Sequence, residues 1–148
     1  MIIKNSISMQ TKSILLSMFL AMTSMCMAQV RISTSDLNGT KWKIKSSSDG
    51  YYVYTAEKEI WYDDKGKPHS SPYYLSDQPI YSYEGSLFDH SKVGKGTTGC
   101  YIVAYNDNNH DIRCYIVLSF TKEKMVTKMI TDKILGSWNR VFHYVRIK

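Results

Sequence analysis

The sequence predicts an all-β protein, a single antiparallel up-and-down barrel of about eight strands, with a β-sandwich as the alternative. The first observation is that short runs rich in Val, Ile, Tyr, Phe and Trp recur along the chain, and such runs favour strands. The second is that Gly, Pro, Asn and Asp separate these runs as turn formers. No long stretch shows the apolar period of a helix, so we expect strands joined directly by turns.

Residues 1–28 are predicted to be an export signal, which is set aside before the fold is considered. The segment has a positive start at Lys4 and Lys12, an apolar stretch from Ile14 to Met22, and a small-x-small cleavage site at Cys26-Met27-Ala28. The apolar stretch is much shorter than the roughly 20 residues that a membrane-spanning helix needs. We therefore expect an exported protein, periplasmic or extracellular, with no integral membrane segment after signal removal.

The mature chain, residues 29–148, is expected to be one domain, because its length supports a single core. An alternative interpretation makes Cys26 a lipid-modified N-terminus. That alternative is less favoured, because bacterial lipoprotein signals place a small residue before the cysteine and this chain has Met25 there.

The mature chain is modestly basic. Without Lys4 and Lys12, the 19 Lys and Arg fall to 17 against 13 Asp and Glu, so the net charge is +4 (17 − 13). The basic residues are dispersed with no run of five or more, so we expect no nucleic-acid partner and interpret them as a solvated surface. They include Lys41, Lys43, Lys45, Lys58, Lys92, Lys122 and Arg146.

The first strands are predicted on either side of a hairpin turn. In Leu37–Lys45 apolar residues alternate with lysines after a glycine, which is typical of a half-buried edge strand with a charged outer face. Asp49-Gly50 is a strong hairpin signal, and Tyr51–Thr55 resumes the strand. The alternation is lost at residues 57–59, which predicts a bulge or bend there.

The middle of the chain is predicted to hold short strands and one long connection. Residues 63–68 form a turn, and prolines bracket a short strand at Tyr73–Leu75. Ile80–Tyr83 is predicted as another short strand. The glycine-punctuated connection that follows carries Leu87 and Phe88, which we expect to fold back onto the sheet.

The centre of the predicted fold is a hairpin. Gly99–Tyr105 and Ile112–Phe120 are rich in β-branched and aromatic residues, and the polar segment 106–111 separates them. The first run is apolar on both faces, as expected of a strand that is covered on both sides. In the second run, period 2 predicts a core face with Cys114, Ile116, Leu118 and Phe120 and a wetter face with Arg113, Tyr115, Val117 and Ser119.

The C-terminal part is predicted to add a turn at residues 121–124 and two strands. The first, Met125–Thr131, has an ambiguous period. The second, Ser137–Lys148, carries apolar side chains on both faces, so we expect it to have partner strands on both edges.

Cys100 and Cys114 are the two cysteines of the mature chain, which is expected in a compartment that permits disulfides. A hairpin centred on Asp107 would place them opposite one another, within the distance that a disulfide tolerates. A hairpin centred on Asn108 would set them diagonally and leave two buried thiols. The sequence leaves both alternatives open.

The opening of the first strand resembles that of the lipocalin-like (calycin) proteins. The residues that carry the resemblance are Leu37, Gly39, Thr40 and Trp42. In that family a glycine and a tryptophan begin the first strand of a small secreted barrel, and the tryptophan plugs its closed end. An arginine near the C-terminus lies over the tryptophan, which Arg146, or failing that Arg140, would match. The family usually has one residue between Gly and Trp, whereas this chain has both Thr40 and Lys41.

The sequence predicts no catalytic residues, no metal site and no cofactor. The cysteines form no C-x-x-C, and the histidines are scattered, so there is no zinc signature. The segment 106–111 lacks the central glycine and closing glutamate of a calcium loop. Gly94–Thr98 resembles a phosphate loop, but it leads into a strand rather than a helix, so a flexible connection is favoured.

Aromatic residues are the chemical peculiarity of the chain, since all 12 tyrosines and three tryptophans lie in the mature part. Tyrosine supplies a ring and a hydroxyl, so these residues could line a pocket or stack on sugars, although strand propensity explains them equally well. The predicted ligand-binding residues are Trp42, Tyr52, Tyr54, Tyr101, Phe120 and Arg146.

Three functions are compatible with this sequence. The favoured one, which the resemblance implies, is a carrier of a small apolar molecule inside the barrel. The second is a surface module that binds protein or glycan. The third is an exported enzyme whose site is not recognisable. A carrier needs an interior void, a surface module an exposed aromatic patch, and an enzyme a polar cleft with perturbed ionisable groups.

Overall fold

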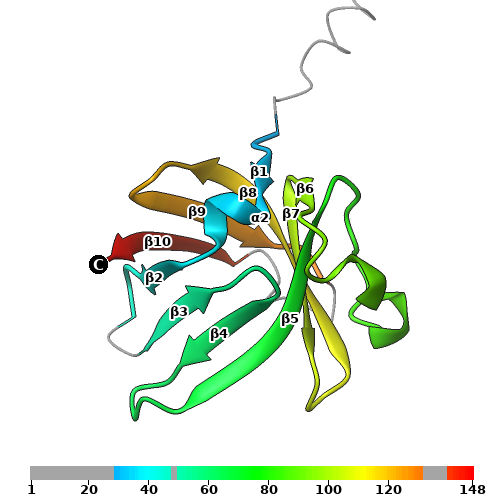
Figure 1. Cartoon of the computed structure of the whole chain (residues 1–148), viewed down its shortest axis with the longest axis horizontal. Helices are drawn as coiled ribbons and strands as arrows, with labels where there is room; N and C mark the ends of the chain where they lie inside the picture. Colours follow the sequence, from blue (N-terminus) through cyan, green and yellow to red (C-terminus); the bar gives the residue numbers. More distant parts are fainter. Residues whose placement is uncertain (1–28, 48–49, 132–139) are drawn as a thin grey trace, which may run out of the picture.

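The computed structural model describes residues 29–47, 50–131 and 140–148. In this part of the chain, eight strands form a closed antiparallel barrel (Figure 1). Strand order follows the chain, and the last strand pairs with both the preceding strand and the first strand of the barrel. The predicted up-and-down barrel is confirmed. The strands are β2 (Thr40–Ile44), β3 (Tyr51–Tyr54), β4 (Lys58–Tyr62), β5 (Pro68–Ser76), β7 (Tyr101–Asn106), β8 (Asp111–Phe120), β9 (Lys124–Met129) and β10 (Val141–Ile147).

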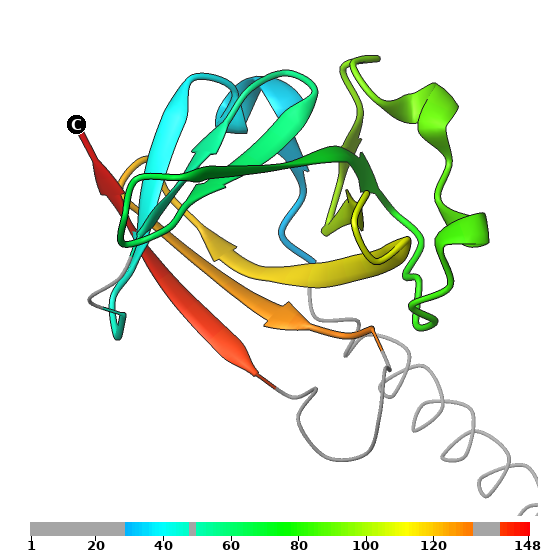
Figure 2. The same cartoon turned by 90° about the horizontal axis from the view of Figure 1, so that it is seen from below.

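Smaller elements lie at one end and along one side of the barrel. β1 (Ile32–Ser33) pairs with β6 (Thr98–Gly99), and α2 (Thr34–Leu37) follows β1 directly. The 3-10 helices η1 (Gly85–Leu87) and η2 (His90–Lys92) belong to the connection between β5 and β6. Figure 2 shows this connection on the side of the barrel away from β2 and β10.

The predicted export signal, residues 1–28, lies outside the described residues, as does the alternative lipid site at Cys26. Within the ranges that the structure describes, no helix is both long and apolar enough to span a membrane.

The chain turns at Thr55–Glu57, just before the bulge or bend predicted at residues 57–59, and Lys58 and Glu59 already belong to β4. The backbone N–H of Thr55 donates to the carbonyl of Lys58 (2.9 Å). The Thr55 hydroxyl oxygen accepts hydrogen bonds from the backbone N–H of Glu57 (3.3 Å) and of Lys58 (2.9 Å). Because one threonine satisfies these turn amides, β3 can end and β4 begin within a few residues.

Strand β5 is longer than the predicted strand Tyr73–Leu75, because it begins at Pro68 and continues through Pro72. The proline is tolerated because it lies where the ladders change. Pro72 opposite Lys58 is the last pair with β4, and Tyr73 opposite Ala104 begins the pairing with β7. Proline has no backbone N–H, but at this point the missing donor costs neither strand pair more than one hydrogen bond.

The connection after β5 differs from the prediction in one respect and agrees in another. Ile80–Tyr83 is not a strand of the barrel, although the carbonyl of Tyr83 accepts a hydrogen bond from the Ile112 N–H (2.8 Å). Phe88 is buried against the outside of the sheet, as expected, whereas Leu87 is half exposed.

The barrel wall separates two apolar clusters. β7 contributes to both of them, which confirms that this strand is covered on both sides. The inner cluster is formed by Ile32, Leu37, Trp42, Tyr54, Tyr73, Leu75, Ile102, Ala104, Tyr115, Val117, Met125 and Tyr144. The outer cluster is formed by Tyr74, Phe88, Cys100, Tyr101, Val103, Ile112 and Cys114.

The predicted faces of β8 are reversed over most of its length. Tyr115 and Val117 belong to the inner cluster, whereas Cys114 belongs to the outer one. The alternation of β8 could not show which face points inward, because both faces carry apolar residues. The connection with η1 and η2 covers the outer face with apolar groups as well. A register shift between Val117 and Ser119 then changes the phase, so that Phe120 points inward as predicted and Leu118 is 43% exposed.

Trp42 is fully buried where the segment before β2 covers one end of the barrel. Its ring centroid lies 5.8 Å from that of Phe120, and its Nε1–H donates to the Thr40 hydroxyl (2.7 Å). The Thr40 hydroxyl in turn donates to the carbonyl of Leu37. We call this the closed end of the barrel, and the opposite end, where β7 turns into β8, the open end.

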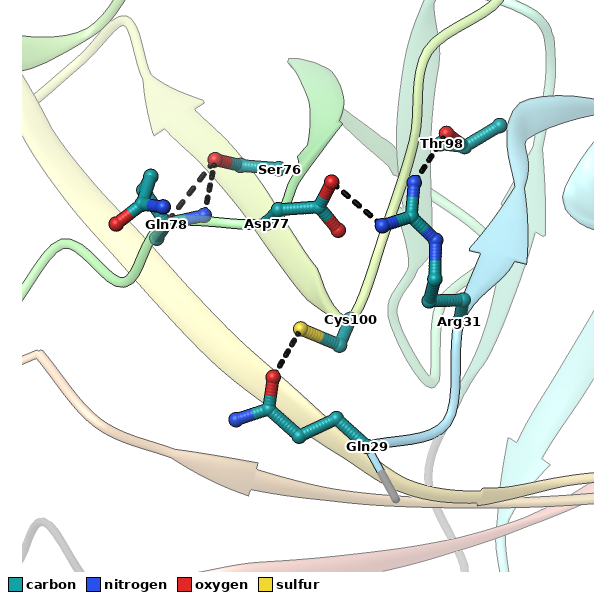
Figure 3. A network of polar contacts seen from close by, with 7 residues as sticks. All are labelled: Gln29, Arg31, Ser76, Asp77, Gln78, Thr98 and Cys100. Carbon is teal, nitrogen blue, oxygen red and sulfur yellow. Dashed lines mark hydrogen bonds and ion pairs between the residues drawn. The ribbon is translucent and has the colours of Figure 1, made fainter. Parts of the chain in front are cut away.

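The N-terminal arm is tied to the chain on both sides of the β5–β6 connection (Figure 3). Arg31 donates to the Asp77 carboxylate (2.7 Å) and to the Thr98 hydroxyl (3.0 Å). The Cys100 thiol donates to the side-chain carbonyl of Gln29 (3.0 Å). The Arg31–Asp77 pair is exposed and contributes little by itself, so the arm is held by the set of contacts rather than by one of them.

Replacing Trp42 by alanine is expected to lower the free energy of unfolding by about 3–5 kcal/mol, as large core truncations do. The loss arises because the ring, its hydrogen bond to Thr40 and its contact with Phe120 all disappear. Denaturant unfolding followed by circular dichroism measures the change. Tyr81→Ala, at a side chain 63% exposed, is the control and should change stability little. Equal stability of Trp42→Ala and the wild type would contradict the assignment of Trp42 as a core residue.

Candidate ligand site inside the barrel

Four of the six predicted ligand-binding residues face the barrel interior. Trp42 and Tyr54 are buried in the inner cluster, and Tyr52 and Phe120 pack against it. Trp42 and Phe120 fill the closed end, while the ring of Tyr52 meets that of Tyr144 edge to face at 5.8 Å. The aromatic wall that the sequence suggested is therefore assembled by β2, β3, β8 and β10.

The other two predicted residues lie elsewhere. Tyr101 belongs to the outer cluster, and its hydroxyl accepts a hydrogen bond from the Gln29 amide (3.3 Å). Arg146 is paired directly with Trp42 across β2 and β10, but its side chain is exposed and donates to the carbonyl of Lys122 (3.3 Å). Arg140, the second candidate for covering Trp42, lies over the ring of Phe142 at 5.4 Å.

An ion pair occupies the middle of the interior. The Arg113 guanidinium on β8 lies 3.3 Å from the Glu59 carboxylate on β4, and it donates to the Ser71 hydroxyl (2.9 Å). The other oxygen of Glu59 accepts a hydrogen bond from the Tyr54 hydroxyl (3.0 Å). Glu59 is almost fully buried and Arg113 is 30% exposed, so the pair reaches from the core towards the open end.

The ion pair determines the electrostatics of the interior. Burial opposes the charged form of Arg113, but its interactions with Tyr115 and Glu59 outweigh burial and raise the pKa of the guanidinium. Burial, assisted by the Glu59 charge, raises the pKa of Tyr52 to about 12. The same two causes hold the pKa of Tyr54 well above its usual value. At neutral pH the Arg113 guanidinium is therefore charged, and the phenols of Tyr52 and Tyr54 are neutral.

A pocket of about 220 Å³ opens beside this pair. Arg113 lines it together with Asn106 and Asp111 from the β7–β8 hairpin and Met129 from β9. At about 30 Å³ for each water molecule, the pocket has room for roughly seven waters, or a ligand group of comparable size. The Nε–H of Arg113 is buried and has no hydrogen-bond partner among the described residues. A buried donor without an acceptor is costly, so this atom is where a bound acceptor oxygen would be stabilised most.

Sequence reasoning missed Arg113 and Glu59. Arg113 was placed on the wetter face of its strand, and Glu59 in a bend. One signal could have identified Arg113, because its neighbours Ile112 and Cys114 are apolar, whereas Glu59 follows Glu57 and Lys58 and gives no such signal. Charged residues in such runs are rarely buried without a partner.

The structure corrects the predicted disulfide, since Cys100 and Cys114 are both free buried thiols. The reason is the hairpin register. Asn106 pairs with Asp111, so residues 107–110 form the loop and Cys114 lies opposite Val103. Three residues at about 3.4 Å each separate Cys100 from that position, which exceeds the reach of a disulfide. The alternative with two buried thiols is the one that the structure has, although in a register different from the one considered.

The described residues include no group of three or more His, Cys, Asp or Glu side chains arranged to hold a metal ion. The comparisons with family models, curated proteins and solved structures find no match for this chain.

The two thiols are expected to resist alkylation in the native protein and to react fully after denaturation. Burial raises the pKa of Cys114 to about 11 and raises that of Cys100 as well, so little thiolate is present at neutral pH. Mass spectrometry of the unreduced protein, alkylated in denaturant, should show two modified cysteines. A mass two hydrogens lighter without modification would establish a disulfide and contradict the free thiols.

The protein is expected to lose stability as the pH rises from about 10 to about 12. Interior tyrosines with raised pKa values keep their protons in the folded state when unfolded tyrosines, with a pKa near 10, have lost theirs. Their contribution to stability is therefore fully present below pH 10 and is lost through the folded pKa. Absorbance at 295 nm, recorded together with circular dichroism, measures both changes.

Tyr52→Phe provides the control, because it removes one of these titrating groups and should reduce the alkaline loss of stability. Complete ionisation of all tyrosines near pH 10 in a protein that still shows its native circular dichroism would contradict this account.

Proposed function

We propose that this protein is an exported, lipocalin-like binding protein that takes a small, largely apolar ligand into the open end of its barrel. The observation that carries the proposal is the buried, unpartnered Nε–H of Arg113 beside a pocket in an otherwise aromatic and aliphatic interior. Small-molecule sites commonly combine an apolar wall with a few polar groups that fix orientation.

The ligand class follows from the lining of the site. Met129 and the neighbouring aromatic rings favour an apolar body, while Arg113 favours an acceptor oxygen such as a carbonyl or carboxylate. Glu59 already neutralises much of the guanidinium charge, so a strongly charged ligand gains less than a polar one. The pocket volume of about 220 Å³ limits the enclosed part of the ligand to a few heavy atoms, and the rest would extend through the open end.

A surface module for protein or glycan is the second candidate. It is favoured by the exposed hydrophobic side chains of Tyr81, Tyr83 and Leu87, which lie close together along the connection between β5 and η2. Exposed aromatic groups of this kind are common at binding surfaces.

Titration with an apolar fluorescent dye and with fatty acids tests the interior site. Met129→Trp should abolish binding, because the larger side chain fills the pocket. Val141→Trp adds the same group at a position 45% exposed, and it should bind as the wild type does. Equal binding by both variants would show that the probe sits elsewhere.

Arg113→Lys tests the role of the guanidinium while keeping a positive charge opposite Glu59. It should weaken fatty-acid binding by about tenfold, as expected for loss of one charge-assisted hydrogen bond, and leave the binding of an uncharged dye nearly unchanged. Arg140→Lys, which conserves charge at a site outside the pocket, is the matched control. No binding of any probe to the wild type would overturn the proposal in favour of the surface module.

A further inference from the structure

A second, larger hollow lies at the closed end, on the outside of the barrel. It is a groove of about 640 Å³ whose walls are the start of β2, the turn between β8 and β9, and the end of β10. Figure 2 shows the end of β10, marked C, beside this turn. The groove shares no lining residue with the pocket at the open end, so the inference that follows does not depend on the proposed function.

The groove gathers basic side chains that are far apart in the sequence. Counting side chains alone, its charge is +4 (5 − 1), and its other lining residues are Gly39, Val145 and Ile147. The ion pairs formed between described residues include none of the five cations. The charged residues of the groove are Lys41, Lys122, Lys124, Arg146, Lys148 and one acid, Glu123.

Backbone pairing holds these cations together. The Arg146 N–H donates to the carbonyl of Glu123 (2.8 Å), and the Arg146 guanidinium donates to the carbonyl of Lys122 (3.3 Å). Lys124 lies opposite Val145 in the β9–β10 ladder, and Lys41 lies opposite Ile147 in the β10–β2 ladder. The strands therefore keep like charges close even though they repel one another, and a bound anion would relieve that repulsion.

The geometry points to a binding site for a compact anion with two phosphate groups, such as a bisphosphorylated sugar, free or as a lipid head group. A phosphate monoester carries about −1.5 to −2 at neutral pH, so two of them supply about −3 to −4 and match the groove charge. One phosphate or one carboxylate would leave most of the cations uncompensated. Arg146 adds the forked donor geometry that suits phosphate oxygens.

Calorimetric titration with fructose 1,6-bisphosphate, and with the corresponding monophosphate at equal ionic strength, tests the site. We expect the bisphosphate to bind about tenfold more tightly and its affinity to fall with added salt. K122Q/K124Q should weaken bisphosphate binding by about tenfold or more, since both lysines line the groove and both are exposed. Undetectable bisphosphate binding, or equal affinity for the monophosphate, would overturn the proposal.

K65Q/K67Q is the matched control, because it removes the same charge from an exposed turn at the open end of the barrel. Its affinity for the bisphosphate should stay within about twofold of the wild type, since distant surface charges are screened. If K65Q/K67Q and K122Q/K124Q weaken binding equally, the effect reflects net charge and the site does not exist. Thermal unfolding of each variant confirms that both fold.

Two further measurements refine the identity of the ligand. The first distinguishes a soluble bisphosphate from a lipid head group, and the second distinguishes a compact ligand from an extended polyanion. Cosedimentation of the wild type with phosphatidylcholine vesicles that contain phosphatidylinositol 4,5-bisphosphate, but not with vesicles that contain phosphatidic acid at equal total charge, and its loss in K122Q/K124Q, would support a lipid head group. Bisphosphate binding without cosedimentation would support a soluble molecule. Lys43 on β2 and Lys45 directly after it lie outside the groove lining. Stronger binding of a single-stranded oligonucleotide that K43Q/K45Q also weakens would therefore overturn the compact ligand.

Discussion

The structure depends on the closure of the sheet by β10, which pairs with β9 on one edge and with β2 on the other. Full closure removes the unpaired edges that an open sheet would expose. It also fixes which side chains face inward, because successive residues of a strand point to opposite sides of the wall. The inner cluster, the interior ion pair and the outer cluster all follow from that one constraint.

Closure makes the interior a place where polar groups must find partners within the protein. The Arg113–Glu59 pair is held by Ser71 and Tyr54, which accept from the cation and donate to the anion. A buried pair of this kind adds little net stability compared with apolar packing, but removing one partner is expected to be costly. A protein that needed only a stable core would not require it. Arg113 lines the pocket at the open end, whereas Glu59 is almost fully buried.

The two ends of the barrel differ in chemistry. At the closed end, Trp42 and Phe120 fill the interior, and the cations lie outside it in a groove formed by the strand ends. At the open end, Arg113 lines the hollow and reaches inward to the buried Glu59. The two hollows therefore share no lining residue, and a substitution in one leaves the lining of the other unchanged.

The sequence alone determined the class of fold, because local alternation and turn chemistry do not depend on distant contacts. The two apolar faces of the last strand predicted a strand with two neighbours, and β10 has them. The alternation around Trp42 predicted a buried inner face, which is present, but also an edge strand, whereas β2 pairs with both β10 and β3. The aromatic wall of the interior was also predictable in part. Tyr52 and Tyr54 are two residues apart on one predicted strand, so they lie on the same face, and that face points into the barrel. Only the tertiary structure decided which face of β8 points inward, because both of its faces are covered and a bulge changes the phase before Phe120. The tertiary structure likewise decided the register of the β7–β8 hairpin, and with it the separation of the two cysteines, because that register depends on the length of one loop. It also brought together Lys41, Lys122 and Arg146, which are far apart in the sequence, in a single basic groove.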